Sequence, residues 1–198
     1  MLENAKTLVT KLKGRESVQL EQVETGKELL GALEQATSRF GAIKNVVLYG
    51  HGGAGSLYLR NDAGFYQNPE GAWDDPDERM RSLGATTVGD LEERMKVDPK
   101  TGVKPIEFAP DATIVLGACN CGFGSTSISK DIAQVTGARV ISAGRGAQPD
   151  RANNPANREI LESRAGWKSF QKVLVNGPPE VTSEDLRKTL LDPKKYLR

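Results

Sequence analysis

Three short runs of β-branched and aliphatic residues constrain the fold of this chain most strongly. They are residues 43–49 (IKNVVLY), 112–116 (ATIVL) and 138–143 (ARVISA), and none shows the strict alternation of a half-exposed strand. Such runs are typical of strands in a parallel sheet that helices cover on both faces. They therefore predict an α/β fold.

Amphipathic segments lie between and around these runs. Leu29, Leu30, Leu33, Ala36 and Phe40 recur at the period of a helix that begins after Thr25. The predicted helices are 2–12, 26–40, 87–95, 127–136 and 183–191, and the further predicted strands are 17–23 and 56–60. Strand and helix thus alternate along the chain, as they do in a layered α/β domain.

The length of 198 residues is suited to a single domain, here 1–198. We expect its core at about 17–145, and we expect 146–198 to form a C-terminal extension with a hairpin in 158–171 and a last helix. Residues 61–84 form a long polar segment around Trp73, and such segments are often functional. The sequence leaves open whether this segment is a lid or an inhibitory loop.

Charge and hydropathy exclude several classes of function. The 27 basic and 26 acidic residues give a net charge of +1, so neither nucleic acid nor an anionic membrane is an expected partner. No run reaches the roughly 18 apolar residues of a membrane span, and the first residues lack a secretory signal. We therefore expect a cytoplasmic protein, with delivery as an effector left open.

The only histidine and one of the two cysteines each follow a predicted strand. His51 lies in GHGGAG after the run 43–49, and Cys119 lies in GACNCG after the run 112–116. In a parallel sheet the loops at the carboxyl ends of the strands converge, so the two side chains are expected to face one crevice. An imidazole beside a thiol favours nucleophilic acyl transfer, because it can accept the thiol proton. Glycine at Gly52 and Gly53 allows backbone amides to approach a developing oxyanion.

The motifs VVLYGHGG (46–53) and TIVLGACNCG (113–122) together resemble those of the caspase-like cysteine peptidases, the clan of caspases, legumains, gingipains and separases. The similarity is greatest to the autoprocessing domains of bacterial toxins and related bacterial caspase-like domains. It extends over about 17–143 and implies a three-layer sandwich, with a mostly parallel sheet and helices on both faces. It also implies a thiol protease that cleaves a protein or peptide, in some members the chain itself.

The resemblance assigns roles residue by residue. His51 matches the general acid/base and Cys119 the nucleophile, while the amides of Gly52 and Cys119 match the oxyanion hole. The specificity pocket is implied in 139–149, with Ser142, Ala143 and Arg145 as substrate-binding residues. In that pocket Arg145 would favour an acidic residue before the cut, whereas base rates favour a solvated arginine. Cys121 has no role in the family pattern.

The resemblance implies no cofactor and no metal, but it raises one activator. In the toxin domains an inositol polyphosphate on a basic cluster switches the site on, and the net charge of +1 does not favour such an activator here. The candidate residues by that analogy are Lys168, Lys172, Arg187, Lys188, Lys194 and Lys195.

Other interpretations of the same residues fit less well. An α/β-hydrolase needs a histidine after its nucleophile, and none follows Cys119. Cys119, Cys121 and His51 fall short of the four ligands of a structural zinc site, and GHGGAG lacks the spacing of a nucleotide-binding loop. The alternative that the sequence leaves open is a catalytically inactive caspase-like module that holds a peptide or partner protein in the same crevice.

Overall fold

The computed structural model describes residues 2–12, 19–67, 76–97, 104–124, 127–145, 147–149, 161–163, 167–171 and 180–191. The helices are α1 (Leu2–Leu12), α2 (Gly26–Phe40), the 3-10 turn η1 (Arg60–Asp62), α3 (Glu78–Ser82), α4 (Val88–Met95), α5 (Ile128–Thr136) and α6 (Ser183–Leu191). The strands are β1 (Ile43–Tyr49), β2 (His51–Gly52), β3 (Ser56–Tyr58), β4 (Phe65–Tyr66), β5 (Thr86–Thr87), β6 (Phe108–Gly117), β7 (Arg139–Ala143), β8 (Ala147–Pro149), β9 (Leu161–Ser163), β10 (Trp167–Phe170) and β11 (Glu180–Val181). The α/β class predicted from the sequence is confirmed.

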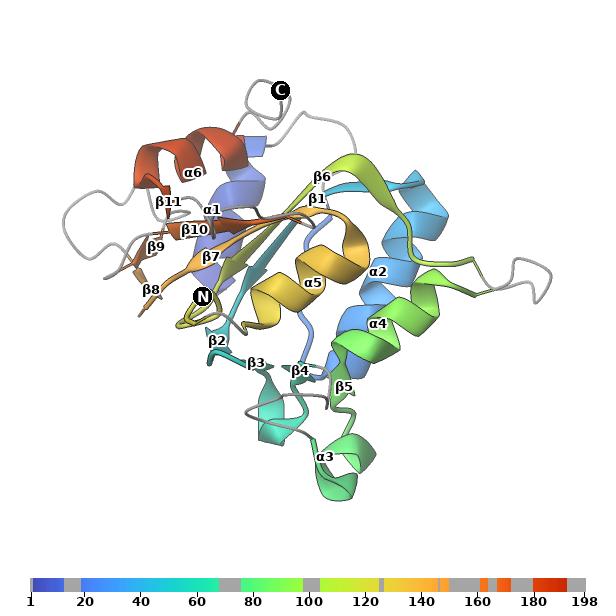
Figure 1. Ribbon diagram of the computed structural model, residues 1–198. Helices are drawn as coiled ribbons and strands as arrows, with labels where there is room; N and C mark the ends of the chain where they lie inside the picture. The colour runs from blue at the N-terminus through green and yellow to red at the C-terminus, as the bar shows by residue number, and fades with distance from the viewer. Residues whose placement is uncertain are drawn as a thin grey trace.

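The central sheet has five strands in the order β1-β6-β7-β10-β11 (Figure 1). The pairs β1/β6 and β6/β7 are parallel, whereas β10 is antiparallel to both β7 and β11. The sheet is therefore mixed, and the prediction of a mostly parallel sheet was wrong for the half that contains β10 and β11. In its described residues the connection from β7 to β10 carries the pair β8/β9 and no crossover helix, so β10 returns antiparallel.

Two other predictions of local structure were wrong. In the described part of the hairpin expected in 158–171, the strands 161–163 and 167–170 do not pair with each other, because β9 pairs with β8 whereas β10 joins the central sheet. The described part of the strand expected at 17–23, residues 19–23, is not in a strand. Both segments have short, weak patterns, and long-range pairing decides such cases more than propensity does. The described strands beyond residue 146 include two of the central sheet, so that part of the chain contributes to the core.

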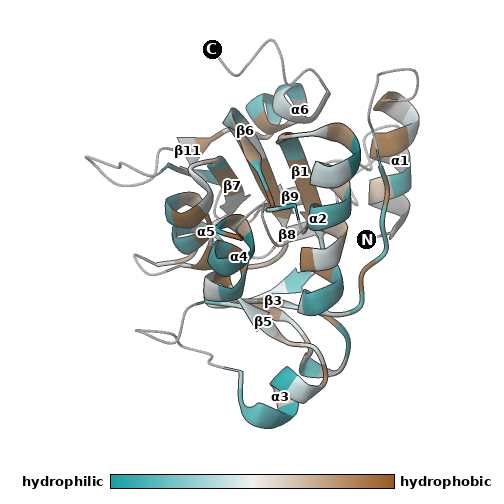
Figure 2. Cartoon of the chain, turned by 90° about the vertical axis from the view of Figure 1, so that its right-hand side faces the viewer, coloured by the Kyte–Doolittle hydropathy of each residue, from teal (hydrophilic) through white to brown (hydrophobic). Residues whose placement is uncertain are grey.

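Helices cover both faces of the central sheet (Figure 1). On one face α2, α4 and α5 bury Leu29, Leu30, Leu91 and Ile132 against β6. On the other face α1 and α6 pack next to each other on strands of the same sheet. The residues that contribute to this second cluster are Leu8, Leu186, Val115, Ile141, Ala143, Trp167 and Val181. In Figure 2 the apolar colour is concentrated on the strands and on parts of the helices, while α3 is mostly hydrophilic.

Local signals fix the helix boundaries. The Thr25 side chain caps α2 by accepting a hydrogen bond from the Glu28 N–H. A complete capping box of Thr87 and Asp90 begins α4, and α5 ends at Gly137 in the left-handed conformation, with φ of 71°. These are the boundaries that the sequence predicts.

A bulge at the start of β6 sets the register between the two central strands. Ile43 pairs with Phe108, but Asn45 pairs with Thr113, so β6 has three extra residues in the interval that includes Pro110. From there the pairing is regular up to Tyr49 and Gly117. The proline cannot donate to a sheet ladder, which agrees with its place in an irregular stretch.

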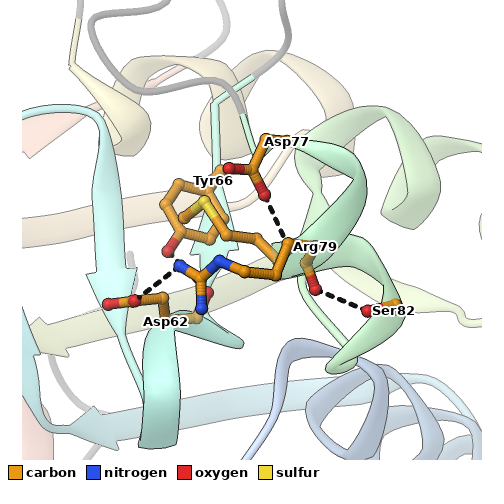
Figure 3. A network of polar contacts seen from close by, with 6 residues as sticks. Asp62, Tyr66, Asp77, Arg79 and Ser82 are labelled. Atoms are coloured by element: carbon orange, nitrogen blue, oxygen red, sulfur yellow. Dashed lines mark hydrogen bonds and ion pairs between the residues drawn. The ribbon is translucent and has the colours of Figure 1, made fainter.

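A small four-stranded sheet, β2-β3-β4-β5, continues from the carboxyl end of β1. Residues of the described part of the polar segment 61–84, on η1, β4 and α3, form a local polar network (Figure 3). There the Tyr66 hydroxyl donates to the Asp62 carbonyl at 2.8 Å, Arg79 pairs with the Asp62 carboxylate at 3.1 Å, and Asp77 caps α3. Residues 68–75, with Trp73, lie outside the described residues, so the expectation of a lid or inhibitory loop stays a prediction.

Candidate functional site

The expected site residues all follow strands of the central sheet. Tyr49 pairs with Gly117 at the last position of the β1/β6 ladder, so His51 and Cys119 each follow the paired strands by two residues. Leu116 pairs with Ser142 in the β6/β7 ladder, and Arg145 follows the end of β7 by two residues. His51, Cys119 and Arg145 thus follow the carboxyl ends of three adjacent parallel strands, β1, β6 and β7, and these three residues are called the row below.

Cys119 belongs to the face of the central sheet that α1 and α6 cover. Val47, Tyr49 and Cys119 all pack against the cluster under these two helices. His51 begins β2 of the small sheet, where it pairs with Tyr58. His51 is exposed and Cys119 is partly exposed, so both groups are accessible from solvent.

Gly52 lies on the opposite face and in close contact with the cysteine turn. A Cβ at Gly52 would lie 2.7 Å from Cys121 Sγ, 3.0 Å from Ala118 Cβ and 3.1 Å from the Cys119 carbonyl oxygen. Only glycine fits at that distance, because real Cβ atoms do not approach so closely. The glycine after the histidine therefore allows the two loops to pack together.

The neighbours of Gly52 use their amides within the fold. The Gly53 N–H donates to the Ser56 carbonyl within the hairpin, and the Gly50 N–H donates to the Gly117 carbonyl of β6. These two bonds hold both ends of the His51–Gly52 segment in place.

Two backbone hydrogen bonds hold the turn after β6. The Phe123 N–H donates to the Asn120 carbonyl at 2.8 Å, and Asn120 has the left-handed φ of 59° that asparagine tolerates. The Gly122 N–H donates to the Ala143 carbonyl at 2.9 Å, which ties the turn to the end of β7. Cys119 therefore sits at the start of a tight turn that is anchored to the next strand.

Cys121, two residues from Cys119, lies in a different environment. It is fully buried, its Sγ donates to the Ser56 carbonyl at 3.8 Å, and its own carbonyl accepts from the Ser129 hydroxyl at 2.6 Å. Burial raises the pKa of the Cys121 thiol to about 12, with a further contribution from Cys119. Cys121 is thus a packing residue that stays a neutral thiol near pH 7.

The hairpin after His51 is held by α5. The Ile128 N–H at the start of this helix donates to the Ala54 carbonyl, and the Gln67 N–H donates to the Gly55 carbonyl, both at 2.8 Å. The Gln67 side chain in turn donates to the Asp131 carboxylate at 3.2 Å. Burial raises the pKa of Asp131, although the bond from Gln67 opposes that shift. The helix that follows Cys119 thereby positions the loop that follows His51.

The structure separates the three residues expected to bind substrate. Ser142 and Ala143 are fully buried, and the Ser142 hydroxyl donates to the Ser129 hydroxyl oxygen at 2.7 Å, because the Ser129 proton goes to the Cys121 carbonyl. Their side chains support the cysteine turn from below and are not exposed for contact with a substrate. Arg145 is exposed, and its guanidinium carbon lies 4.9 Å from the centre of the Phe123 ring.

Sequence reasoning missed two exposed aromatic residues beside this row. Tyr58 pairs directly with His51 across the hairpin and is 43% exposed, and Phe123 in the cysteine turn is 45% exposed. A Cβ at Gly53 would lie 2.9 Å from the Tyr58 hydroxyl, so this ring extends over the glycines. The alternation in SLYLR (56–60) contained the signal for Tyr58, since it puts this residue on the face of the strand opposite to Leu57 and Leu59.

The basic residues considered for an inositol polyphosphate are only partly described. Lys168 lies on β10, and Lys188 on α6 lies 3.9 Å from Glu184 one turn earlier. The side chains of the other four lie outside the described residues. The activator therefore stays an implication of the resemblance.

Comparisons with known proteins add no assignment. No protein-family model matches the chain, and no curated protein or solved structure is significantly similar to it. Across the described ranges, no three or more His, Cys, Asp or Glu side chains gather in a way that suits a metal ion. Within those same ranges, no helix combines the length and apolar character needed to cross a bilayer.

Proposed function

We propose that this chain is a cysteine endopeptidase of the caspase-like type, with a three-layer arrangement in which His51 and Cys119 act as a dyad. The observation that carries the proposal is the close packing of the loop after β1 on the turn after β6, where a Cβ at Gly52, the neighbour of His51, would lie 3.1 Å from the Cys119 carbonyl oxygen. Both side chains are accessible, as a group that meets a peptide must be.

The chemistry follows from these groups. His51 accepts the proton of the Cys119 thiol, and the sulfur attacks the carbonyl carbon of the scissile peptide bond. The amides of Gly52 and Cys119 donate to the oxyanion of the tetrahedral intermediate. His51 then returns the proton to the leaving amine as the C–N bond breaks, which leaves an acyl group on sulfur. Water, deprotonated by His51, releases that acyl group and restores the thiol.

Arg145 is the substrate-binding residue that the geometry supports best. It is the third member of the row and the only exposed one of the three residues expected to contact substrate. A guanidinium in contact with Phe123 of the cysteine turn favours a carboxylate side chain on the substrate, because it offers planar paired donors.

The proposal is tested by cleavage and by covalent labelling. The purified chain is incubated with a peptide library and analysed for self-cleavage by mass spectrometry, and Cys119 is labelled with peptidyl acyloxymethyl ketones. We expect Cys119→Ala to abolish cleavage and labelling, and His51→Ala to lower the cleavage rate by about 100- to 10,000-fold. Lys96→Ala, at an exposed ion pair remote in sequence from the row, is the matched control and is expected to retain full activity.

The inactive binding module is the alternative outcome. If peptidyl ketones and iodoacetamide modify Cys119 no faster than a model thiol between pH 5 and 8, the thiolate is not activated. Cleavage that persists in Cys119→Ala would likewise contradict the assignment of the nucleophile.

A further inference from the structure

The cysteine turn brings an exposed aromatic ring against the exposed arginine of the row. Phe123 follows Cys119 by four residues, and Arg145 follows the end of β7 by two. The guanidinium carbon of Arg145 lies 4.9 Å from the ring centroid of Phe123, within the range of a cation–π contact. Two loops that are distant in sequence are thereby joined on the Arg145 side of Cys119.

The backbone fixes the ring in this place. The turn that carries Phe123 is closed by its own hydrogen bond to Asn120 and anchored by Gly122 to Ala143. Gly122 has no room for a side chain, because a Cβ there would lie 2.7 Å from Ser142 Oγ. The Cα of Phe123 is therefore held in place, and the ring extends from it with 45% of the side chain exposed.

Stacking has a specific effect on an arginine. It uses the flat face of the guanidinium, whereas the N–H donors lie in the plane and point outward from its edge. A free arginine loses rotamer freedom when it binds a carboxylate, and a stacked arginine has already lost part of it. A ring under Arg145 therefore prepares that side chain for an anionic partner.

We infer that Phe123 is a positioning residue that holds the guanidinium of Arg145 beside Cys119 to receive a carboxylate side chain of the substrate. This inference rests on the proposed function for its substrate, a peptide with an acidic residue before the cut. It adds Phe123 to the site. It predicts that the aromatic character of this residue, more than its bulk, determines the preference for an acidic residue before the cut.

The chain contains a matched control for this contact. Arg39 and Phe40 at the end of α2 form a second pair with the same 4.9 Å separation, and Phe40 is 40% exposed. These two residues are neighbours in sequence on a helix, and neither follows β1, β6 or β7. Phe40→Ala removes an equivalent contact outside the row.

The experiment measures the labelling of Cys119 by two N-acetylated tetrapeptide acyloxymethyl ketones that differ only in Asp or Asn before the ketone. We expect the wild type to react faster with the Asp probe, and Arg145→Gln to lose about tenfold or more of that ratio. Phe123→Ala and Phe123→Leu are expected to lower the ratio by about two- to fivefold, whereas Phe123→Trp restores it and Phe40→Ala does not change it. Equal rates with both probes in the wild type, or an unchanged ratio in Phe123→Ala, would overturn the inference.

A binding measurement separates this inference from the proposed function. The affinity of Cys119→Ala for the corresponding N-acetylated peptide amides is measured by calorimetry, with and without Phe123→Ala. If no probe labels Cys119 in the wild type, the peptidase proposal fails. In that case tighter binding of the Asp peptide that weakens in Phe123→Ala still supports the role of Phe123, and its absence refutes that role.

Discussion

At the scale of single residues, the main feature is the contrast between two thiols in one turn. Cys119 is partly exposed at the end of β6, on the same face as Tyr49. Cys121 faces the opposite side, where its sulfur contacts Gly52 and the Ser56 carbonyl. A spacing of two residues therefore gives one thiol to solvent and the other to the core.

The buried Cys121 thiol is expected to make the protein less stable as the pH becomes alkaline. The pKa of Cys121 is raised in the folded state from its ordinary value of 9.0 to about 12, so folding disfavours the thiolate. The contribution of the neutral Cys121 thiol to the free energy of unfolding is complete below pH 9. It is lost as the pH rises toward 12, at about 1.4 kcal/mol for each pH unit. Urea unfolding followed from pH 8 to 11 is expected to show this slope in the wild type and a smaller one in Cys121→Ala.

Cys119→Ala provides the comparison for that measurement. The Cys119 thiol is partly exposed, so we expect most of the decrease of the free energy of unfolding with pH to remain in Cys119→Ala. Equal slopes in the wild type and in Cys121→Ala would show that the buried thiol does not control this pH range.

At the scale of secondary-structure elements, the close contact between β2 and the cysteine turn determines the geometry of the site. We expect Gly52→Ala to push β2 away from Ala118 and Cys121, and to reduce Cys119 labelling by at least about tenfold. Gly50→Ala is the control two residues earlier, where a Cβ would meet nothing within 4 Å. Labelling rates and circular dichroism of both variants test this. Equal labelling of the two variants would exclude a role for the contact.

The elements that the sequence predicts well are those with local signals. The helix at 26–40 and the helix that begins after Thr87 have caps and an apolar stripe, and the structure has both. The positions of His51 and Cys119 at strand ends were also predicted from local patterns. Pairings such as β8 with β9 were not predictable, because they depend on contacts between segments with little local pattern. Phe123 was missed because its contact with Arg145 joins two loops.

At the scale of the whole molecule, the C-terminal part of the chain is part of the core. Trp167 on β10 is 1% exposed and packs in the same cluster as Leu8 of α1 and Leu186 of α6. Cys119 packs against this cluster as well. The helices α1 and α6 therefore support the face of the sheet on which Cys119 lies.

Truncation of a residue in this cluster tests whether α6 contributes to the stability of the core. Leu186 is 1% exposed, so Leu186→Ala is expected to lower the free energy of unfolding by about 2 to 5 kcal/mol in urea denaturation. Leu83→Ala is the control, because this leucine is 42% exposed and its loss is expected to change stability by less than about 0.5 kcal/mol. A similar small effect in both variants would mean that α6 is dispensable for folding.

The bulge at the start of β6 makes the site tolerant of length changes on one side and intolerant on the other. A residue deleted near Pro110 falls in a stretch that is already out of step with β1, and a shorter bulge can absorb it. A residue deleted between Thr113 and Gly117 would shift the register of β6 by one position, so that a different residue would take the place of Cys119 after the strand. Natural or engineered variation in chain length is therefore expected to accumulate before residue 113 and to be purged after it.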